Sequence, residues 1–179
     1  MKPTSFAVEV VAYDPAWPEA FEREADLLQD ILGDNAVRIF HIGSTSVPGL
    51  RAKPILDILP VVASLERLDA SAERLAALGY VAMGEYGIPG RRYFYKGGAR
   101  RTHHLHAFGY DCTEHILRHV AFRDYLRRHE GVAAEYATLK TGLAAQYPDD
   151  IESYCDGKDG FVKRTEKAAL QWHWRTRES

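Results

Sequence analysis

Cysteine is scarce in this sequence, whose 179 residues include only Cys112 and Cys155. The two residues lie far apart in the chain, and neither belongs to a spacing that is typical of metal-binding motifs. A disulfide framework is therefore not expected. Thiols that stay reduced are typical of the cytoplasm, which is the location that we expect for this protein.

Long apolar runs and an excess of positive charge are also missing. No stretch approaches the roughly 20 apolar residues of a membrane-spanning helix, so we expect no membrane partner. The chain carries 23 Lys and Arg residues against 25 Asp and Glu residues, with both signs interspersed, and its net charge is −2. Proteins that bind nucleic acids usually present a clearly basic face, so this balance argues against a nucleic acid as partner.

The composition that remains is that of a globular domain, with 46% apolar and 27% charged residues. No internal repeat or low-complexity linker divides the chain. The sequence therefore predicts a single domain over residues 1–179, in which about 1–110 form an αβ core and 111–179 form a helical C-terminal part.

Hydrophobic periodicity, taken together with capping and turn residues, predicts the secondary structure. Five segments are typical of strands: Val37–Ile42, Ile55–Val62, Tyr80–Met83, Arg92–Lys96 and Thr102–Phe108. Helices are expected between Asp14 and Gly33, between Ser64 and Gly79, and in three segments after Glu114. This order predicts an α+β or mixed α/β fold in which helices pack on one sheet.

A polar stretch rich in turn residues, HIGSTSVPGLRAKPILDI (residues 41–58), separates the first two predicted strands. It is not a P-loop, because that motif has four residues between its glycines and a lysine after the second. Here five residues separate Gly43 from Gly49, and Leu50 occupies the position of the lysine. Pro54 also opposes the long helix that would follow a P-loop.

The same stretch is suited to phosphate binding in another way. Gly43, at a strand end, lets backbone N–H groups approach an anion, while Ser44 and Thr45 offer hydroxyl donors and Lys53 a positive charge. Asp57, in an otherwise apolar strand, provides a hard oxygen ligand of the kind that Mg²⁺ prefers. The alternative is a rigid connection in which Asp57 is paired with an arginine, because an isolated buried acid is unfavourable.

Three histidines occur within THHLHAF, residues 102–108. In a strand, His104 and His106 project from one face, and His103 and Leu105 project from the other. Two imidazoles so placed could ligate a metal, donate to a phosphate, or act as acid and base near neutral pH. Together with Asp57 they could form a metal site of two histidines and one carboxylate.

Other cationic residues are candidate phosphate ligands. Arg91 or Arg92, in the segment before these histidines, could bind a phosphate or lie on the surface. Lys140 lies beside an apolar helical stripe and could reach towards a cleft, or only extend along the surface. Tyr154 and Lys158 are spaced to share one face of a C-terminal helix and could contact a ligand.

These blocks together resemble the GrpB family. HIGSTSVPGLRAKPILDI looks like the signature of that family, and the resemblance continues in YDPAWPEAFERE, GIPGRRYF, RTHHLH, FRDYLRRHEGVAAEYATLK and DDIESYCDGKDGFV, in order along nearly the whole chain. The resemblance implies the nucleotidyltransferase fold, with a mixed sheet of about five strands. It also implies that related modules occur fused to dephospho-CoA kinase. It does not supply an established reaction.

The nucleotidyltransferase superfamily places a Gly-Ser pair after one strand, two acids on the next strand, and often a third acid on a later strand. In that superfamily the acids hold two magnesium ions. Gly43 and Ser44 match the pair and Asp57 matches the first acid, but Leu59 stands at the position of the second acid and cannot ligate a metal. A histidine, His104 or His106, would stand in place of the later acid. This departure leaves a one-metal site, a histidine-assisted site or a binding-only module as alternatives.

The expected function is the transfer of a nucleotidyl or phosphoryl group from a nucleoside triphosphate (NTP) to a small acceptor. Asp57 would hold Mg²⁺, and His104 or His106 would act as a metal ligand or general base. The residues expected to bind phosphates are Gly43, Ser44, Thr45, Lys53, Arg92 and Lys140. Two other functions remain open: a non-catalytic module that binds a nucleotide or phosphometabolite, and a metal-dependent phosphohydrolase that uses the two histidines.

Overall fold

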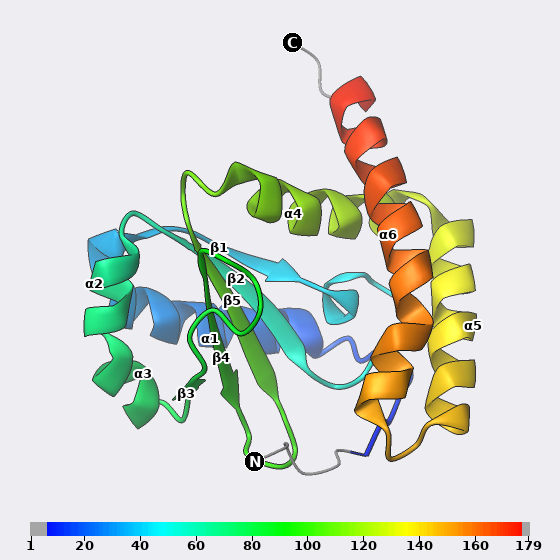
Figure 1. Cartoon of the computed structure of the whole chain (residues 1–179), viewed down its shortest axis with the longest axis horizontal. Helices are drawn as coiled ribbons and strands as arrows, with labels where there is room; N and C mark the ends of the chain where they lie inside the picture. The colour runs from blue at the N-terminus through cyan, green and yellow to red at the C-terminus, as the bar shows by residue number, and fades with distance from the viewer. Residues whose placement is uncertain (1–6, 177–179) are drawn as a thin grey trace.

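A five-stranded mixed sheet forms the centre of the protein, whose computed structural model describes residues 7–176 (Figure 1). The strands are β1 (Ala36–Ile42), β2 (Leu56–Val62), β3 (Val81–Ala82), β4 (Arg91–Lys96) and β5 (His103–Gly109). Their order across the sheet is β1-β2-β5-β4-β3. Strands β2 and β5 run parallel, whereas the other neighbouring strands run antiparallel. The prediction of an α+β fold around a mixed sheet is confirmed.

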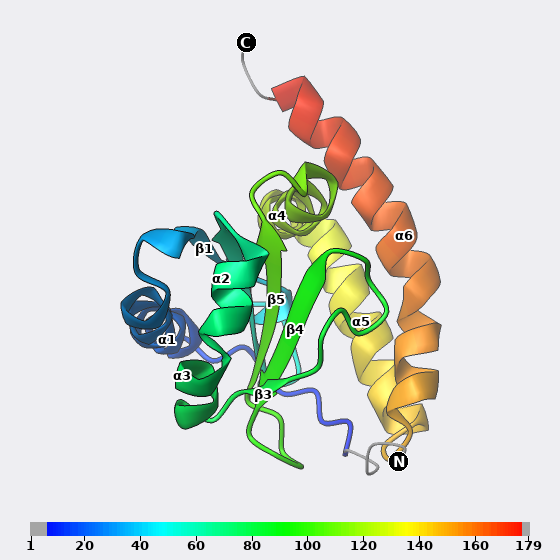
Figure 2. The same cartoon turned by 60° about the vertical axis from the view of Figure 1, so that its left-hand side comes forward.

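Helices cover both faces of this sheet. Their bounds are α1 (Trp17–Leu32), α2 (Leu65–Ala70), α3 (Ala72–Ala77), α4 (Thr113–Arg128), α5 (Glu130–Gln146) and α6 (Ile151–Thr176), with two short 3-10 turns, η1 (Gly33–Asn35) and η2 (Ser44–Ser46). Helices α5 and α6 lie side by side at one end of the sheet (Figures 1 and 2). Within residues 7–176, no helix has both the length and the apolar character required to cross a bilayer.

Strand alternation divides β2 between two environments. Ile58 is fully buried in the main core, in the same cluster as Leu28 of α1. On the opposite face, Leu59 is buried in a second cluster against which Ile116 of α4 packs. Asp57 lies on this second face as well, because side chains two residues apart in a strand point the same way. Unlike Leu59, the acid remains partly exposed.

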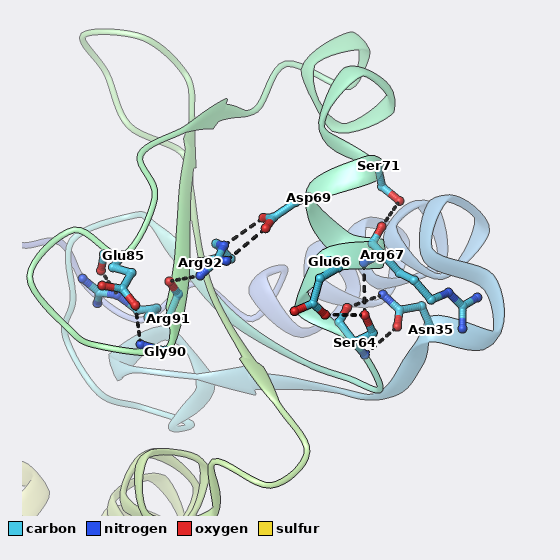
Figure 3. A network of polar contacts seen from close by, with 10 residues as sticks. All are labelled: Asn35, Ser64, Glu66, Arg67, Asp69, Ser71, Glu85, Gly90, Arg91 and Arg92. Atoms are coloured by element: carbon cyan, nitrogen blue, oxygen red, sulfur yellow. Dashed lines mark hydrogen bonds and ion pairs between the residues drawn. The ribbon is translucent and has the colours of Figure 1, made fainter.

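The helix predicted between Ser64 and Gly79 is interrupted, and this corrects the prediction. Ser64 caps α2 as expected, since its hydroxyl accepts the N–H of Arg67 at 3.2 Å. The Ser71 hydroxyl then donates to the Arg67 carbonyl at 3.0 Å, the acceptor that a continuous helix would reserve for the N–H of Ser71 (Figure 3). Such side-chain bonds compete with helical pairing, and α3 begins at the next residue.

Helices α5 and α6 approach each other closely at Gly157. Glycine weakens a helix by its intrinsic propensity, yet α6 runs without interruption from Ile151 to Thr176. A Cβ atom on Gly157 would lie 2.4 Å from the Leu143 Cδ2 of α5, so the absent side chain permits the approach. The close packing of α6 on α5 is thus possible at this glycine, and Tyr154, three residues earlier in α6, is buried.

Candidate functional site

Asp57 and two imidazoles form the centre of the candidate site. In the sheet, Asp57 of β2 lies opposite Ile42 of β1 on one side and opposite His104 of β5 on the other. Its Oδ1 lies 3.3 Å from His104 Nδ1 and 3.1 Å from His106 Nε2. The predicted alternation of β5 is confirmed, because His103 lies on the other face, 3.8 Å from Glu24 of α1. Asp57 is thus paired with two imidazoles and not with the arginine of the alternative interpretation.

The second neighbour of His106, Arg91, determines the tautomer of the imidazole. Arg91 is 7% exposed, and its Nη1 lies 3.5 Å from His106 Nδ1. A guanidinium can only donate, so His106 Nδ1 accepts, and the ring proton lies on Nε2, where it is donated to Asp57. His106 therefore acts as a hydrogen-bond donor that holds the carboxylate in place.

The carboxyl group of Asp57 is ionised at neutral pH. Burial alone raises its pKa, but hydrogen bonds from His104 and His106 outweigh that effect and lower the pKa well below its ordinary value. The side chain nevertheless remains 30% exposed. A permanently charged oxygen ligand therefore faces solvent at the end of an apolar strand.

Gly43 makes the close approach to Asp57 possible. It follows β1 with φ +71° and ψ −173°, a conformation left almost entirely to glycine. A Cβ atom at this position would lie 2.6 Å from Asp57 Oδ2 and 2.9 Å from Asp57 Cβ. The backbone at Gly43 and the second carboxylate oxygen are consequently in direct contact.

A cleft of about 290 Å³ opens in front of Asp57. Strands and loops of the αβ core contribute Gly43, Ser44, Thr45, Lys53, Asp57 and His104 to its lining. The helices contribute Phe122, Tyr136, Lys140, Tyr154, Cys155 and Lys158. The structure therefore brings together, in one cleft, the acid, one imidazole and five of the six predicted phosphate ligands.

Three ammonium groups surround this cleft. Lys53 Nζ and Lys158 Nζ lie 5.5 and 4.5 Å from the ring centroid of Tyr154, so both lie beside the same aromatic side chain. The pKa of Lys158 is lowered, first by burial and further by the charge of Lys53. Three lysines near one carboxylate give the cleft an excess of positive charge, which a polyanion would neutralise.

Lys140 is the most deeply placed of the three lysines, at 2% exposed. Its Nζ donates to the Ser44 hydroxyl at 2.8 Å and to the backbone carbonyl of Arg51. Burial, aided by repulsion from Lys158 and Lys53, lowers the pKa of Lys140 to about 7. Lys140 therefore joins α5 to the turn after β1, and its charge responds to any anion that enters the cleft.

Two predicted phosphate ligands differ from expectation. Arg92 Nε and Nη2 donate to the two carboxylate oxygens of Asp69 in α2, at 2.8 and 2.9 Å (Figure 3). Strand alternation places Arg92 on the face opposite to His106, so the structure does not bring it to the cleft. Thr45 lines the cleft, but its hydroxyl is already bonded to His41 Nε2 at 2.9 Å.

Two tyrosines that were not among the predicted site residues, Tyr93 and Tyr136, also lie beside the site. Tyr93 lies opposite His106 in the sheet, and burial and the charge of Asp57 raise the pKa of its phenol. The signal for Tyr93 was available, because it alternates in phase with Arg91 on a strand next to the histidines. Tyr136 belongs to an apolar helical stripe, and nothing in the sequence distinguishes it from a core residue.

The three central side chains also meet a geometric requirement for a metal site. One ligand atom from each of Asp57, His104 and His106 lies within 4.8 Å of the others. However, ligation through His106 Nε2 would move its proton to Nδ1, towards the Arg91 guanidinium, which can only donate. Asp57 alone fits Mg²⁺, since this ion is commonly held by one or two carboxylates together with phosphate oxygens.

The fold is similar to that of solved nucleotidyltransferase structures. Terminal uridylyl transferase 4 from Trypanosoma brucei superimposes with TM-scores of 0.50 and 0.51 in its UTP-bound and CTP-bound structures, at 17% and 16% identity. These alignments cover 91% and 93% of this chain, and 52% and 53% of the transferase chain. The fold is thus that of the nucleotidyltransferases, as the resemblance implied.

The chain belongs to the GrpB family, whose model matches residues 7–168 under the description "GrpB protein". The crystal structure of the conserved protein GrpB from Enterococcus faecalis superimposes with a TM-score of 0.90 at 49% identity, covering 93% of this chain and 99% of that one. The UPF0157 protein YqkA of Bacillus subtilis is 47% identical over 92% of this chain.

Part of a longer protein is also similar. The chain spans 48% of the length of YqkA. It likewise aligns with 48% of the dephospho-CoA kinase of Mycobacterium tuberculosis (strain H37Rv), at 28% identity over 93% of this chain. The expected relationship to a module of dephospho-CoA kinase is therefore confirmed.

Proposed function

We propose that this GrpB protein transfers a nucleotidyl or phosphoryl group from an NTP to a small acceptor. The observation that carries the proposal is the single cleft in which three lysines and the Ser44 hydroxyl surround an ionised Asp57. The NTP class is supported by the fold, because the structures of the uridylyl transferase contain bound UTP or CTP.

The phosphate chain of the NTP would lie along the cationic side of the cleft. Lys53 and Lys158 would meet its terminal phosphates as point charges, and Ser44 would donate a hydrogen bond. Lys140, with a pKa of about 7 in the protein alone, would be fully protonated once the polyanion is bound. Charge neutralisation of this kind is the main demand of phosphoryl and nucleotidyl transfer.

Asp57 would hold Mg²⁺ together with oxygens of the NTP. When bound, the ion supplies Lewis-acid polarisation of the phosphate that is attacked. His106 keeps Asp57 in place by donating its Nε2 proton to Oδ1, and the carboxylate stays ionised. Gly43 lets the backbone approach Oδ2, so the turn that contacts the phosphates and the acid form one unit.

His104 is suited to accept the proton of the acceptor. Its Nδ1 faces Asp57 Oδ1, so the Nε2 atom on the far side of the ring is left to face the cleft that His104 lines. In the transfer, an acceptor hydroxyl oxygen forms a bond to phosphorus and the bond to the leaving phosphate oxygen breaks. The hydroxyl proton passes to His104 Nε2, and Asp57 stabilises the resulting imidazolium, in the manner of an aspartate–histidine pair.

The binding-only module is favoured by one specific observation. Leu59, at the position of the second acid, is 0% exposed and lies in an apolar cluster with Phe108. A carboxylate there would be buried without a partner, so this position offers no second metal ligand. The phosphohydrolase is opposed by Arg91, which fixes the proton of His106 on the nitrogen that a metal would need.

The test uses ATP, CTP, GTP and UTP with Mg²⁺, first in thermal-shift and calorimetric binding measurements. Reactions with a small-molecule cell extract then follow the label from NTPs carrying ³²P at the α or γ position. Label from the α position on a new product indicates nucleotidyl transfer, and label from the γ position indicates phosphoryl transfer. Inorganic phosphate alone indicates the hydrolase, and tight binding without any product indicates the binding module.

Matched variants complete this test. Asp57→Asn should lower turnover by about 100-fold or more, because a neutral amide replaces the charged ligand. Asp26→Asn changes an exposed acid of α1 in the same way and should have no effect. Lys158→Met should weaken NTP binding by about tenfold, whereas Lys163→Met, on the exposed side of the same helix, should not. NTP binding and turnover that survive Asp57→Asn would refute the proposed function.

A further inference from the structure

A second cleft of about 350 Å³ adjoins the first at His104. The two clefts share Lys53, Ile55, His104 and Cys155 in their linings, so they are separate chambers of one opening. The volume lies in the range of about 300–1,000 Å³ that is typical of small-molecule sites. His104 is therefore within reach of ligands in both chambers.

Two tyrosines, Tyr93 and Tyr86, line the second cleft next to the histidines. The Tyr93 ring lies 5.6 Å from that of His104 and 5.4 Å from that of His106. The Tyr86 ring stacks on Tyr93 with centroids 4.9 Å apart and planes 10° apart. Tyr86 is 54% exposed, so the ring has an open surface at the cleft that it lines.

Tyr86 is held in an unfavourable backbone conformation. Among residues 7–176, Tyr86 is the only residue other than glycine that has a positive φ, which is +47°. The buried Arg91 fixes this loop by donating from Nη2 to the Tyr86 carbonyl at 2.6 Å and from Nε to the Glu85 carbonyl at 3.2 Å. The Glu85 carboxylate in turn accepts the N–H of Gly90 at 2.7 Å (Figure 3). A left-handed tyrosine on an exposed loop is strained, and strain of this kind accumulates at ligand sites.

The rest of the second cleft is cationic. Its lining includes Lys53, Arg100 and Arg101, against one acid, Glu9. Arg100 and Arg101 come from the turn between β4 and β5, and Lys53 comes from the loop before β2. The second cleft therefore offers two kinds of contact: its tyrosines favour a flat ring, and its cationic side chains favour an anion in another part of the cleft.

We propose that the second cleft binds the acceptor, and that the acceptor is a small molecule with a planar ring and a phosphate or carboxylate group. This inference rests on the proposed function, because it assigns the first cleft to the NTP. The ring stacks on Tyr86, the anionic group meets Arg100, and the acceptor hydroxyl is directed towards His104 at the junction of the chambers. Aromatic side chains with an open face bind planar bases in this way, aided by neighbouring cations.

The test uses adenosine 5′-monophosphate as a probe that combines a ring with an anion, and calorimetry on the full chain saturated with a non-hydrolysable NTP analogue and Mg²⁺. Adenosine and ribose 5-phosphate serve as partial probes. We expect the whole probe to bind at least tenfold more tightly than either partial probe. Tyr86→Asn should weaken its binding by about 5- to 150-fold, since stacking is lost while asparagine tolerates the left-handed backbone.

The controls separate this inference from the proposed function. Tyr86→Phe keeps the ring and should bind the probe as the wild type does, and Tyr110→Asn changes another exposed tyrosine and should have no effect. All these variants should bind the NTP analogue normally, and Lys158→Met should weaken only the analogue. Probe binding that survives Tyr86→Asn would overturn the inference. Competition between the probe and the NTP analogue would also overturn it, because the second cleft would then hold the base of the NTP. Failure of the analogue to bind would refute the proposed function. The second cleft would still be supported as a ligand site if the free protein binds the probe and Tyr86→Asn abolishes that binding.

Discussion

Gly43→Ala is the substitution that tests the architecture of the site most directly. The new methyl group would lie 2.6 Å from Asp57 Oδ2 and 2.9 Å from Asp57 Cβ. Restoring a normal contact of roughly 3.5 Å requires the acid to move by about 1 Å. Rotation of the Asp57 side chain away from His104 and His106 can move Oδ2 but not Cβ, so the turn after β1 must also shift relative to β2.

The magnitude separates into a backbone part and a site part. Alanine in a conformation left to glycine lowers the free energy of unfolding by about 1–3 kcal/mol. Gly33 has a φ of +56° and a ψ of −131°, and a Cβ atom there would meet nothing within 4 Å, so Gly33→Ala reports the backbone part alone. The displaced carboxylate in Gly43→Ala should in addition weaken metal binding by about 10- to 100-fold and lower turnover by about 100-fold.

The measurements are urea unfolding of both variants and calorimetric titration with Mn²⁺, as a stand-in for Mg²⁺, in the presence of an NTP analogue. We expect Gly33→Ala to lose stability but to bind metal normally. Gly43→Ala should lose both. If Gly43→Ala binds Mn²⁺ as the wild type does, the contact between this turn and the acid has no functional role, and the reasoning is refuted.

Three further predictions concern stability. The pKa of Lys140 is about 7 in the folded protein, against the ordinary value of 10.5. Between these pH values the folded state binds fewer protons than the unfolded state, so the cost of burying the lysine falls as pH rises. The free energy of unfolding should therefore rise from pH 7 to pH 10 relative to Lys140→Met, and urea titrations that show no such trend would contradict the assignment. Glu24→Gln, which weakens buried bonds to a tyrosine hydroxyl and a lysine, should lower stability by about 1.5–3 kcal/mol without affecting metal binding, whereas Glu19→Gln in an exposed pair should change it by less than about 1 kcal/mol. Gly157→Ala should destabilise the protein by about 1–3 kcal/mol through the clash with α5. Gly142→Ala, whose methyl group would meet nothing within 4 Å, should stabilise it by about 0.5–1 kcal/mol. Thermal melts in which both substitutions shift the melting temperature in the same direction would count against close packing of the two helices.

Local chemistry predicted the centre of the site. Alternation along β5 was enough to place His104 and His106 on one face, and the lone acid in an apolar strand marked Asp57. Arg92 was misplaced because its partner, Asp69, lies in a helix whose position no local pattern gives. The break at Ser71 was missed for a related reason, since a serine hydroxyl has equally good partners inside and outside a helix.

The cationic side of the cleft could not be predicted from local patterns. Lys140 donates to Ser44, which lies 96 residues earlier, and this pairing depends on where α5 packs against the sheet. The position of Lys158 depends in turn on the contact of Gly157 with Leu143. Helix packing is decided by the sum of many side-chain contacts, so a single sequence gives the candidate lysines but not their convergence.

The buried ammonium that joins α5 to Ser44 makes ligand occupancy and helix docking linked equilibria. Under the proposed function, an NTP that touches lysines on both sides of the cleft would favour the docked arrangement of α5, whereas a divalent cation bound by the strands alone would not. Amide hydrogens in α5 and α6 should consequently exchange with solvent more slowly in the nucleotide-loaded protein than in the metal-loaded one. The C-terminal helices would thus be docked more firmly in the nucleotide-loaded protein than in the metal-loaded one.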